Sequence, residues 1–395
     1  MTVLVTLLIG SFIIKDIIFI NDPYIMRGIS QFLGLICVGV WAFSRFFSVK
    51  VLLRYWMFWC YVFASFISSL YSTDIVFVFM QVTSLSAVLL FFVAYYEYGN
   101  KSNVHCNYNV SIFHASALII GLVTVISLIL YVIYPRLVID MQNDFRFHGL
   151  YGKSGMMASA SSILIGIALL GNYKVPVKIL ILFPSLACLL LTLSRTFWIA
   201  SAISIVSVLY IYKLIAKKYV ILGILLIILS SVCSYVMDFE YGKISKLARP
   251  ESVGNLTGRV ALWNKSMNEF YEKPLFGNGL TAGSEVLSGR GGVSIFSKTT
   301  NTGREMSRRT SHNGYIQSLL DTGVFGFVFY FSIILYSIAN YIKYDKRRIY
   351  PVELYILILM AIANIGESMI YAASSYSAVL FWAMAVKSFQ VKMAI

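Results

Sequence analysis

The sequence has little charge. Only 12% of its 395 residues are Asp, Glu, Lys or Arg, whereas 59% are hydrophobic, and the mean hydropathy is +0.78. An ordinary soluble domain is about 25% charged and roughly 45–50% apolar. A soluble fold of this length could not bury so much apolar surface in a single core. The composition therefore excludes a soluble multidomain enzyme and predicts an all-α polytopic membrane protein.

Two features of many exported proteins are also missing. The chain has five cysteines, four of which lie inside apolar runs, and no Cys-x-x-Cys pair. This excludes a disulfide scaffold and gives no indication of a zinc or redox site. No basic segment precedes the first apolar run, so we expect no cleavable signal peptide and a first helix that stays as an anchor.

Acidic residues are scarce relative to basic ones. The chain has 17 Asp and Glu against 32 Lys and Arg, a formal net charge of +15. An excess of this size fits nucleic acid, an anionic membrane surface or an anionic substrate. The positions of the basic residues have to decide among these three.

What the sequence has in abundance is long apolar runs. A span needs about 20 consecutive apolar residues, and we count about twelve candidates. The runs lie near Val3–Ile20, Gly28–Phe47, Val51–Tyr71, Ile75–Tyr96, Val110–Tyr134, Gly155–Leu170, Val177–Leu193, Phe197–Tyr212, Tyr219–Val236, Gly314–Asn340, Val352–Tyr371 and Ser374–Phe389.

The basic residues of the short loops predict the orientation. With the N-terminus in the cytoplasm, most of them fall on the inside, as the positive-inside rule expects. The short outer loops then carry only Arg27, Arg136, Arg146, Lys153 and Arg195. Both termini are predicted to be cytoplasmic, and nothing in either set of charges points to nucleic acid.

Two outer loops are longer than the rest, Pro135–Ser154 and Asp238–Ser311. Loops of the second length are usually functional or partly folded. The sequence therefore divides into N-terminal spans (1–134), central spans with the first loop (135–236), the large outer loop (237–311) and C-terminal spans (312–395).

The large loop contains a readable helix. Thr257 can cap its start and Pro274 can end it. One face carries apolar residues at helical spacing, namely Val260, Trp263, Met267 and Phe270. We expect this face to lie on the outer membrane interface.

Three arginines on the predicted outer side are candidates for anion binding. Arg195 follows Ser194 where one apolar run ends and the next begins, and Arg259 stands at the start of the loop helix. A guanidinium matches two phosphate oxygens, and a helix start favours anions. Arg146 in the first loop is the third. The alternative for each is a structural role, a snorkelling or solvated arginine.

His312 and Glu367 are candidates for proton chemistry. His312 lies where the large loop re-enters the membrane, and histidine is a natural proton acceptor at neutral pH. His148 is its rival on the same side, and a hydrogen-bonded structural histidine is the alternative. Glu367 is an acid inside a predicted span, so it is a functional candidate or a structural partner of an arginine.

Three blocks in this order resemble the O-antigen ligase and O-antigen polymerase superfamily of bacterial envelope glycosyltransferases. Ser194-Arg195-Thr196 opens a span, as in the Ser-Arg motif of the family. Gly258-Arg259 with Trp263 and Pro274-Leu275-Phe276-Gly277-Asn278-Gly279 resembles the large-loop pattern, and Ser311-His312-Asn313 resembles the His-Asn block. Arg146 to Leu150 resembles a fourth block but lacks the Pro-Asn that often follows it.

The resemblance implies a GT-C-like, metal-independent, inverting glycosyltransferase that needs no cofactor. Its donor would be an oligosaccharide on undecaprenyl diphosphate at the periplasmic face of the inner membrane. Arg195, Arg259 and His312 take the places of the essential residues of the family. A chain-length regulator and membrane lipids are further partners that the family implies.

The sequence leaves the acceptor open. A polymerase attacks with another lipid-linked repeat unit, and a ligase attacks with lipid A–core. Polymerase is the preferred interpretation, because polymerases are the more divergent branch. A lipid-linked sugar transporter or flippase is the alternative from another class, since about twelve spans fit many transporters.

Overall fold

The apolar runs form α-helices. The computed structural model describes residues 2–15, 17, 39, 49–101, 107–140, 146–214, 256–287, 310–346, 348–373 and 375–391. The helices are α1 Thr2–Lys15, α3 Val49–Arg54, α4 Trp56–Ser69, α5 Ile75–Lys101, α6 Asn107–Ile133, α7 Ser154–Leu170, α8 Val175–Leu191, α9 Arg195–Ile211, α12 Leu256–Glu272, α13 Gly283–Leu287, α14 Gly314–Tyr344, α15 Pro351–Ala363 and α16 Tyr376–Val391. The described residues are mainly helical with one short two-stranded hairpin, which is consistent with the predicted all-α membrane protein.

Three of the described helices are long and apolar enough to cross a bilayer: Ile75–Glu97, Ile112–Ile133 and Gly314–Tyr344. Five apolar helices are shorter: Trp56–Ser69, Ser154–Leu170, Val175–Leu191, Arg195–Ile211 and Pro351–Ala363. The predicted runs Gly28–Phe47, apart from Gly39, and Tyr219–Val236 lie outside the described residues. The total of twelve spans stays a prediction.

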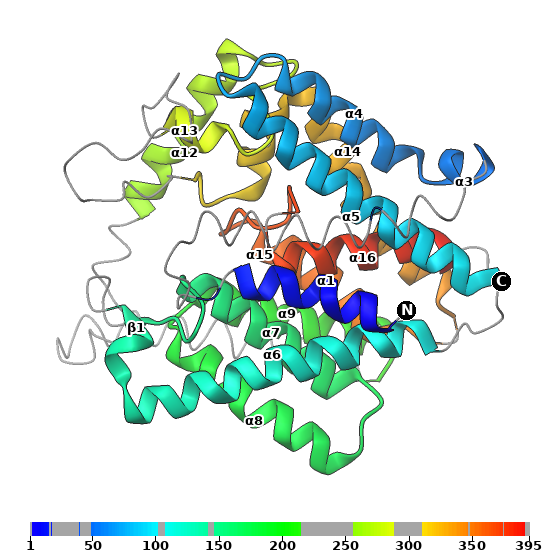
Figure 1. The fold of residues 1–395 in the computed structure, drawn as a ribbon, viewed down its shortest axis with the longest axis vertical. Coiled ribbons are helices and arrows are strands. Elements are labelled where there is room, and N and C mark those ends of the chain that lie inside the picture. The colour runs from blue at the N-terminus through cyan, green and yellow to red at the C-terminus, as the bar shows by residue number, and fades with distance from the viewer. Residues whose placement is uncertain are drawn as a thin grey trace.

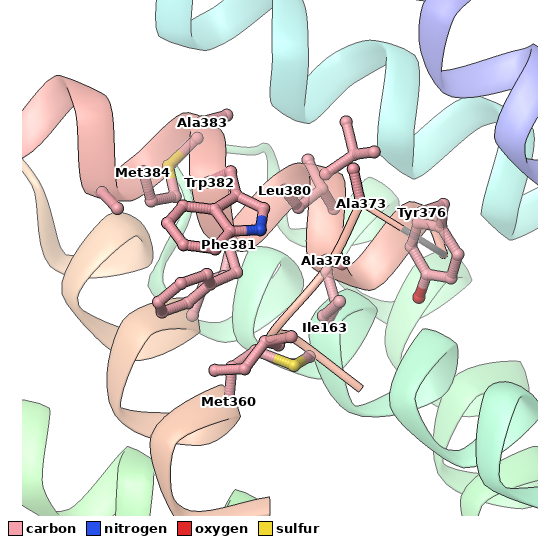
Figure 2. Packing of buried hydrophobic residues seen from close by; sticks show 14 of the residues in the cluster. Ile163, Met360, Ala373, Tyr376, Ala378, Leu380, Phe381, Trp382, Ala383 and Met384 are labelled. Carbon is pink, nitrogen blue, oxygen red and sulfur yellow. The ribbon is translucent and has the colours of Figure 1, made fainter. Parts of the chain in front are cut away.

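Helix α16 lies at the centre of the bundle. It packs against α1, α5, α14 and α15, and all of its side chains from Tyr376 to Val391 are buried. Figure 1 shows α15 and α16 between one group of helices with α4, α5 and α14 and another with α6, α7, α8 and α9. In Figure 2, Trp382 and Phe381 of α16 pack near Met360 of α15.

The outer surfaces of several helices are apolar. On α8, Leu180 is 71% exposed and Phe183 is 74% exposed, and on α6 Val132 is 80% exposed. Large exposed apolar surfaces are unusual on soluble proteins and normal where lipid surrounds a helix. The bundle therefore buries its aromatic centre and leaves aliphatic and aromatic side chains for the membrane.

The predicted span Val352–Tyr371 is wrong in its second half. Helix α15 ends at Ala363, so Glu367 lies in a non-helical segment and not inside a helix. The carbonyl of Asn364 accepts the N–H of Gly314 at 2.8 Å, and the Asn364 side chain donates to the Tyr330 hydroxyl. These bonds to α14 take the place of further helical turns. Such backbone is tolerated at membrane depth only where protein or a cavity encloses it.

The loop helix exists, with two differences from its prediction. Helix α12 begins at Leu256, so Thr257 stands inside its first turn and does not cap it. The helix packs against α13 and α14, and Phe270 is only 7% exposed. Part of the predicted interfacial face is therefore turned toward protein. The run Val51–Tyr71 also differs, because Tyr55 separates α3 from α4.

The first outer loop is a short hairpin. Strands β1 (Ile139–Asp140) and β2 (Arg146–Phe147) pair antiparallel after a 3₁₀ turn, Pro135–Leu137. The carbonyl of Val138 accepts the N–H groups of His148 and Gly149. The hairpin thus leads the chain from the end of α6 to the start of α7.

Candidate active site

The turn that follows α15, residues 364–368, is where several predicted site residues meet. Arg259 of α12 donates from Nη1 to the carbonyl of Gly366 at 3.3 Å. Gly366 also lies against Thr196 of α9, since a Cβ atom at this glycine would come within 2.8 Å of the Thr196 Oγ1. Arg195 directly precedes Thr196. Two of the three motif blocks therefore reach the same backbone position from different helices.

His312 reaches the next residue of the same turn. Its Nδ1 is 3.6 Å from the Glu367 Oε2, with side-chain exposures of 45% and 22%. The Nδ1 atom is buried, so the exposed part of the ring lies away from Glu367. The third motif block thus joins the 364–368 turn as well, and Glu367 faces a histidine.

The first turns of three helices lie beside this turn. Gly155 in the first turn of α7 lies beside the Glu367 carboxylate, and a Cβ there would be 3.9 Å from it. Gly314 at the start of α14 donates its N–H to Asn364, and Thr196 stands in the first turn of α9. Each helix N-terminus carries about half a positive charge. Together with Arg259 they make the turn a region that favours anions.

Asn313 and Trp263 hydrogen bond to backbone groups near His312. Asn313 is the N-cap of α14, and its Oδ1 accepts from the N–H groups of Tyr315 and Ile316 at 3.0 and 3.1 Å. The Trp263 Nε1 donates to the Ser311 carbonyl at 2.9 Å. Ser194 is the N-cap residue of α9 in an extended conformation, without a side-chain capping bond.

Arg146 and His148 belong to the hairpin of the first outer loop and not to the 364–368 turn. Arg146 lies in β2 and faces Asp140 in the strand register. The His148 Nδ1 is 2.8 Å from the Gly149 carbonyl oxygen, so one ring nitrogen is already engaged. His312 therefore contacts the 364–368 turn, whereas the contacts given for His148 are with its own hairpin.

Two polar residues near His312 are not recognised from the sequence. Gln317 and Asp321 are fully buried on α14 and hydrogen bond to each other, from Nε2 to Oδ1 at 3.0 Å. Polar residues four apart in an apolar run share a helix face, which is a readable signal. Among the described residues, no three His, Cys, Asp or Glu side chains gather as metal ligands.

One family model matches the region that carries the three motif blocks. The O-antigen ligase model, Wzy_C, matches residues 180–331. This match supports the O-antigen ligase and polymerase superfamily for the segment. The segment carries Arg195, Arg259 and His312, whereas the 364–368 turn lies beyond it. A search of curated proteins finds no match.

The match supports a general type of activity. Members of the superfamily are membrane proteins of O-antigen ligase and polymerase type, which implies lipid-linked glycan substrates and a bacterial membrane. The apolar helices of the fold agree with that setting. The resemblance read from the three motif blocks is confirmed.

Proposed function

We propose that this protein is a polysaccharide polymerase that joins undecaprenyl-diphosphate-linked repeat units by metal-independent, inverting glycosyl transfer. The observation that carries the proposal is the meeting of Arg259, His312 and the start of α9 at Gly366 and Glu367. Such a reaction needs positive charge for the leaving diphosphate and a base for the acceptor hydroxyl, which arginines and a histidine supply. The overall architecture is proposed to be GT-C-like.

The leaving group is the first chemical requirement. When the bond between the anomeric carbon and the diphosphate breaks, charge develops on a phosphate oxygen. Arg195 and Arg259, with the N-termini of α7, α9 and α14, supply positive potential where that charge would form. Arginines here take the place of a divalent ion. Arg146 is proposed as a further anion contact from the hairpin.

The acceptor hydroxyl is the second requirement. A sugar hydroxyl attacks poorly until a base removes its proton, and a placed base contributes about 10²–10⁴ in rate. His312 turns Nδ1 toward Glu367 and leaves the exposed side of its ring for substrate. We assign the base to its Nε2, with Glu367 orienting the ring, as in other carboxylate–histidine pairs.

In the proposed step, one bond forms at the anomeric carbon and one breaks. The acceptor oxygen attacks the anomeric carbon, its proton passes to His312, and undecaprenyl diphosphate leaves with the bonding electron pair. Attack opposite the leaving group inverts the anomeric carbon. We place the reaction on the periplasmic side of the inner membrane, because the positive-inside rule puts the 364–368 turn there.

Ligase activity is the second candidate, since the matching family model is described as O-antigen ligase. Deleting the gene and separating the surface polysaccharide on a gel decides between the two. Loss of a polymerase leaves a single repeat unit on core. Loss of a ligase leaves bare core with polymer held on its carrier. Flux of labelled lipid-linked sugar without any new glycosidic bond would instead indicate a transporter.

Complementation of the deletion tests the site. His312→Ala and Arg195→Ala, at normal expression, are expected to restore no normal polymer. His114→Ala is the matched control, because this exposed histidine lies on α6 against Tyr173. Normal polysaccharide from either site variant would refute the assignment.

A further inference from the structure

The backbone at His312 is held in an unusual conformation. Its φ is +51°, in the left-handed region that a residue with a side chain rarely adopts. Such a conformation persists where surrounding structure over-determines it, commonly at functional sites. The contacts that hold this turn are therefore worth tracing.

The peptide groups of Ser311, directly before His312, are held from two sides. The Ser311 N–H donates to the Gln317 Oε1 at 2.9 Å, and the Ser311 carbonyl accepts from the Trp263 Nε1 at 2.9 Å. Its hydroxyl donates to the Asn313 carbonyl at 2.7 Å, and Ser311 is completely buried. Both peptide groups that flank its Cα are thereby fixed.

Gln317 is itself held by a chain of bonds. Its Nε2 donates to the Asp321 Oδ1 at 3.0 Å, which fixes which end of the amide faces Ser311. The Asp321 carboxylate in turn accepts the N–H groups of Thr281 and Gly283 at 2.9 and 3.0 Å. Asp321 and Gln317 are fully buried, where an unmet polar group is costly. A chain of hydrogen bonds through Asp321, Gln317 and Ser311 therefore connects the 281–283 loop to the residue before His312.

Helix α12 holds the Ser311–His312 turn from the other side. Arg259 and Trp263 are four residues apart and so lie on one helix face. Arg259 reaches Gly366 and Trp263 reaches Ser311. One face of one helix thus sets the distance between the arginine and the turn that carries the histidine.

We infer that Gln317, Asp321 and Trp263 are positioning residues that hold the Ser311–His312 turn so that the His312 ring faces both Glu367 and the acceptor hydroxyl. None of the three is placed on substrate. This inference rests on the proposed role of His312 as the base. A misplacement of about 1 Å can lower an enzymatic rate by about 10².

The principal test uses Gln317→Leu, which removes the acceptor for Ser311 and the donor to Asp321 at nearly the same volume. The substrate is undecaprenyl-diphosphate-linked oligosaccharide extracted from cells lacking the gene, with the acceptor that the gel experiment identifies. We expect kcat to fall by about 10–100-fold with KM nearly unchanged. Ser337→Ala is the matched control, a buried hydroxyl on α14 far along the helix, and should leave both constants unchanged.

A double-mutant cycle with His312→Ala separates positioning from general destabilisation. If Gln317 acts through His312, then Gln317→Leu lowers the residual rate of His312→Ala no further. The same fold loss in both backgrounds, an unchanged kcat in the single variant, or a raised KM at constant kcat would each overturn the inference. A His312→Ala protein with wild-type kcat would instead refute the proposed function.

Trp263→Phe covers the case in which Gln317→Leu does not fold or the residual rate of His312→Ala is too small to measure. It removes only the indole donor to Ser311 and is expected to lower kcat by about 10-fold at constant KM. Trp59→Phe is its control, since Trp59 donates to the Leu52 carbonyl at 3.0 Å away from the site. Equal kcat in the two variants would contradict the positioning role of Trp263 and overturn the inference.

Discussion

At the scale of single residues, Arg259 shows why charge alone does not define the site. Its guanidinium is half-buried and anchored by the Gly366 carbonyl, and its planar fork presents further donors. A lysine would keep the charge but could not hold Gly366 and bind phosphate oxygens with one planar group.

We expect Arg259→Ala to lower kcat by about 10²–10³ and Arg259→Lys to recover only part of that loss. The rate of polymer formation with extracted lipid-linked donor measures both. Lys265→Ala removes another cation from the same helix, one that bonds to the Leu287 carbonyl at 2.9 Å, and should be close to wild type. Equal effects of Arg259→Ala and Lys265→Ala would rule out a specific role for Arg259.

A second test at the scale of residues concerns Gly366, because its lack of a side chain lets α9 approach the 364–368 turn. A Cβ there would meet the Thr196 Oγ1 and Cγ2, both at 2.8 Å. Gly366→Ala should therefore push α9 and Arg195 away and lower kcat. Adding Thr196→Ala should restore much of the rate, because it removes both clashing atoms. An equally inactive double variant would show that Gly366 matters for another reason.

At the scale of elements, the kink in α14 couples the outer loop to the membrane helix. Gly323 has φ +65°, and beyond it Val324 and Phe325 donate their N–H groups to the carbonyls of Pro274 and Leu275. The 274–283 loop thus completes hydrogen bonds that the kink removes from α14. In this loop Gly277 and Gly279 have positive φ values of +68° and +105°.

Replacing Gly323 by alanine should destabilise this junction. A Cβ at Gly323 would lie 2.3 Å from the Leu275 carbonyl oxygen, and the positive φ adds strain of about 1–3 kcal/mol. We expect a lower thermal unfolding temperature in detergent. Gly121→Ala on α6 is the control, since no heavy atom lies within 4 Å of its Cβ position. A Gly323→Ala protein that melts like Gly121→Ala would contradict the junction.

The elements also show where prediction from sequence succeeds and where it stops. Helices such as α5, α6 and α14 follow their apolar runs closely, because lipid and core both demand a hydrogen-bonded helix. The end of α15 is not predictable from a local pattern, because its cause is a tertiary bond between Asn364 and Gly314. The motif residues are recognisable by type and order, but the pairing of His312 with Glu367 depends on packing that no local pattern encodes.

At the scale of the whole molecule, the polar contacts sort into two ends of the bundle. Near one end Lys273 of the outer loop donates to the Tyr71 carbonyl after α4, on the same predicted side as the 364–368 turn. At the other end Arg54 bonds to Glu97, and Tyr212 to Asp345. Each of these contacts joins residues that the sequence assigns to one side of the membrane. This sorting follows from the alternating direction of successive helices and would be the same in either orientation of the bundle.

Orientation decides whether the proposed chemistry is periplasmic, and single cysteines in a cysteine-free background test it. Lys153, which is exposed, and Leu275, which is 65% exposed, lie in the predicted outer loops. Val49, 70% exposed, and Lys346 lie on the predicted inner side with the Lys and Arg excess. In intact spheroplasts an impermeant maleimide should label Lys153→Cys and Leu275→Cys but reach Val49→Cys and Lys346→Cys only after lysis. The reverse pattern would place Arg195, Arg259 and His312 in the cytoplasm, where the polymerase proposal fails.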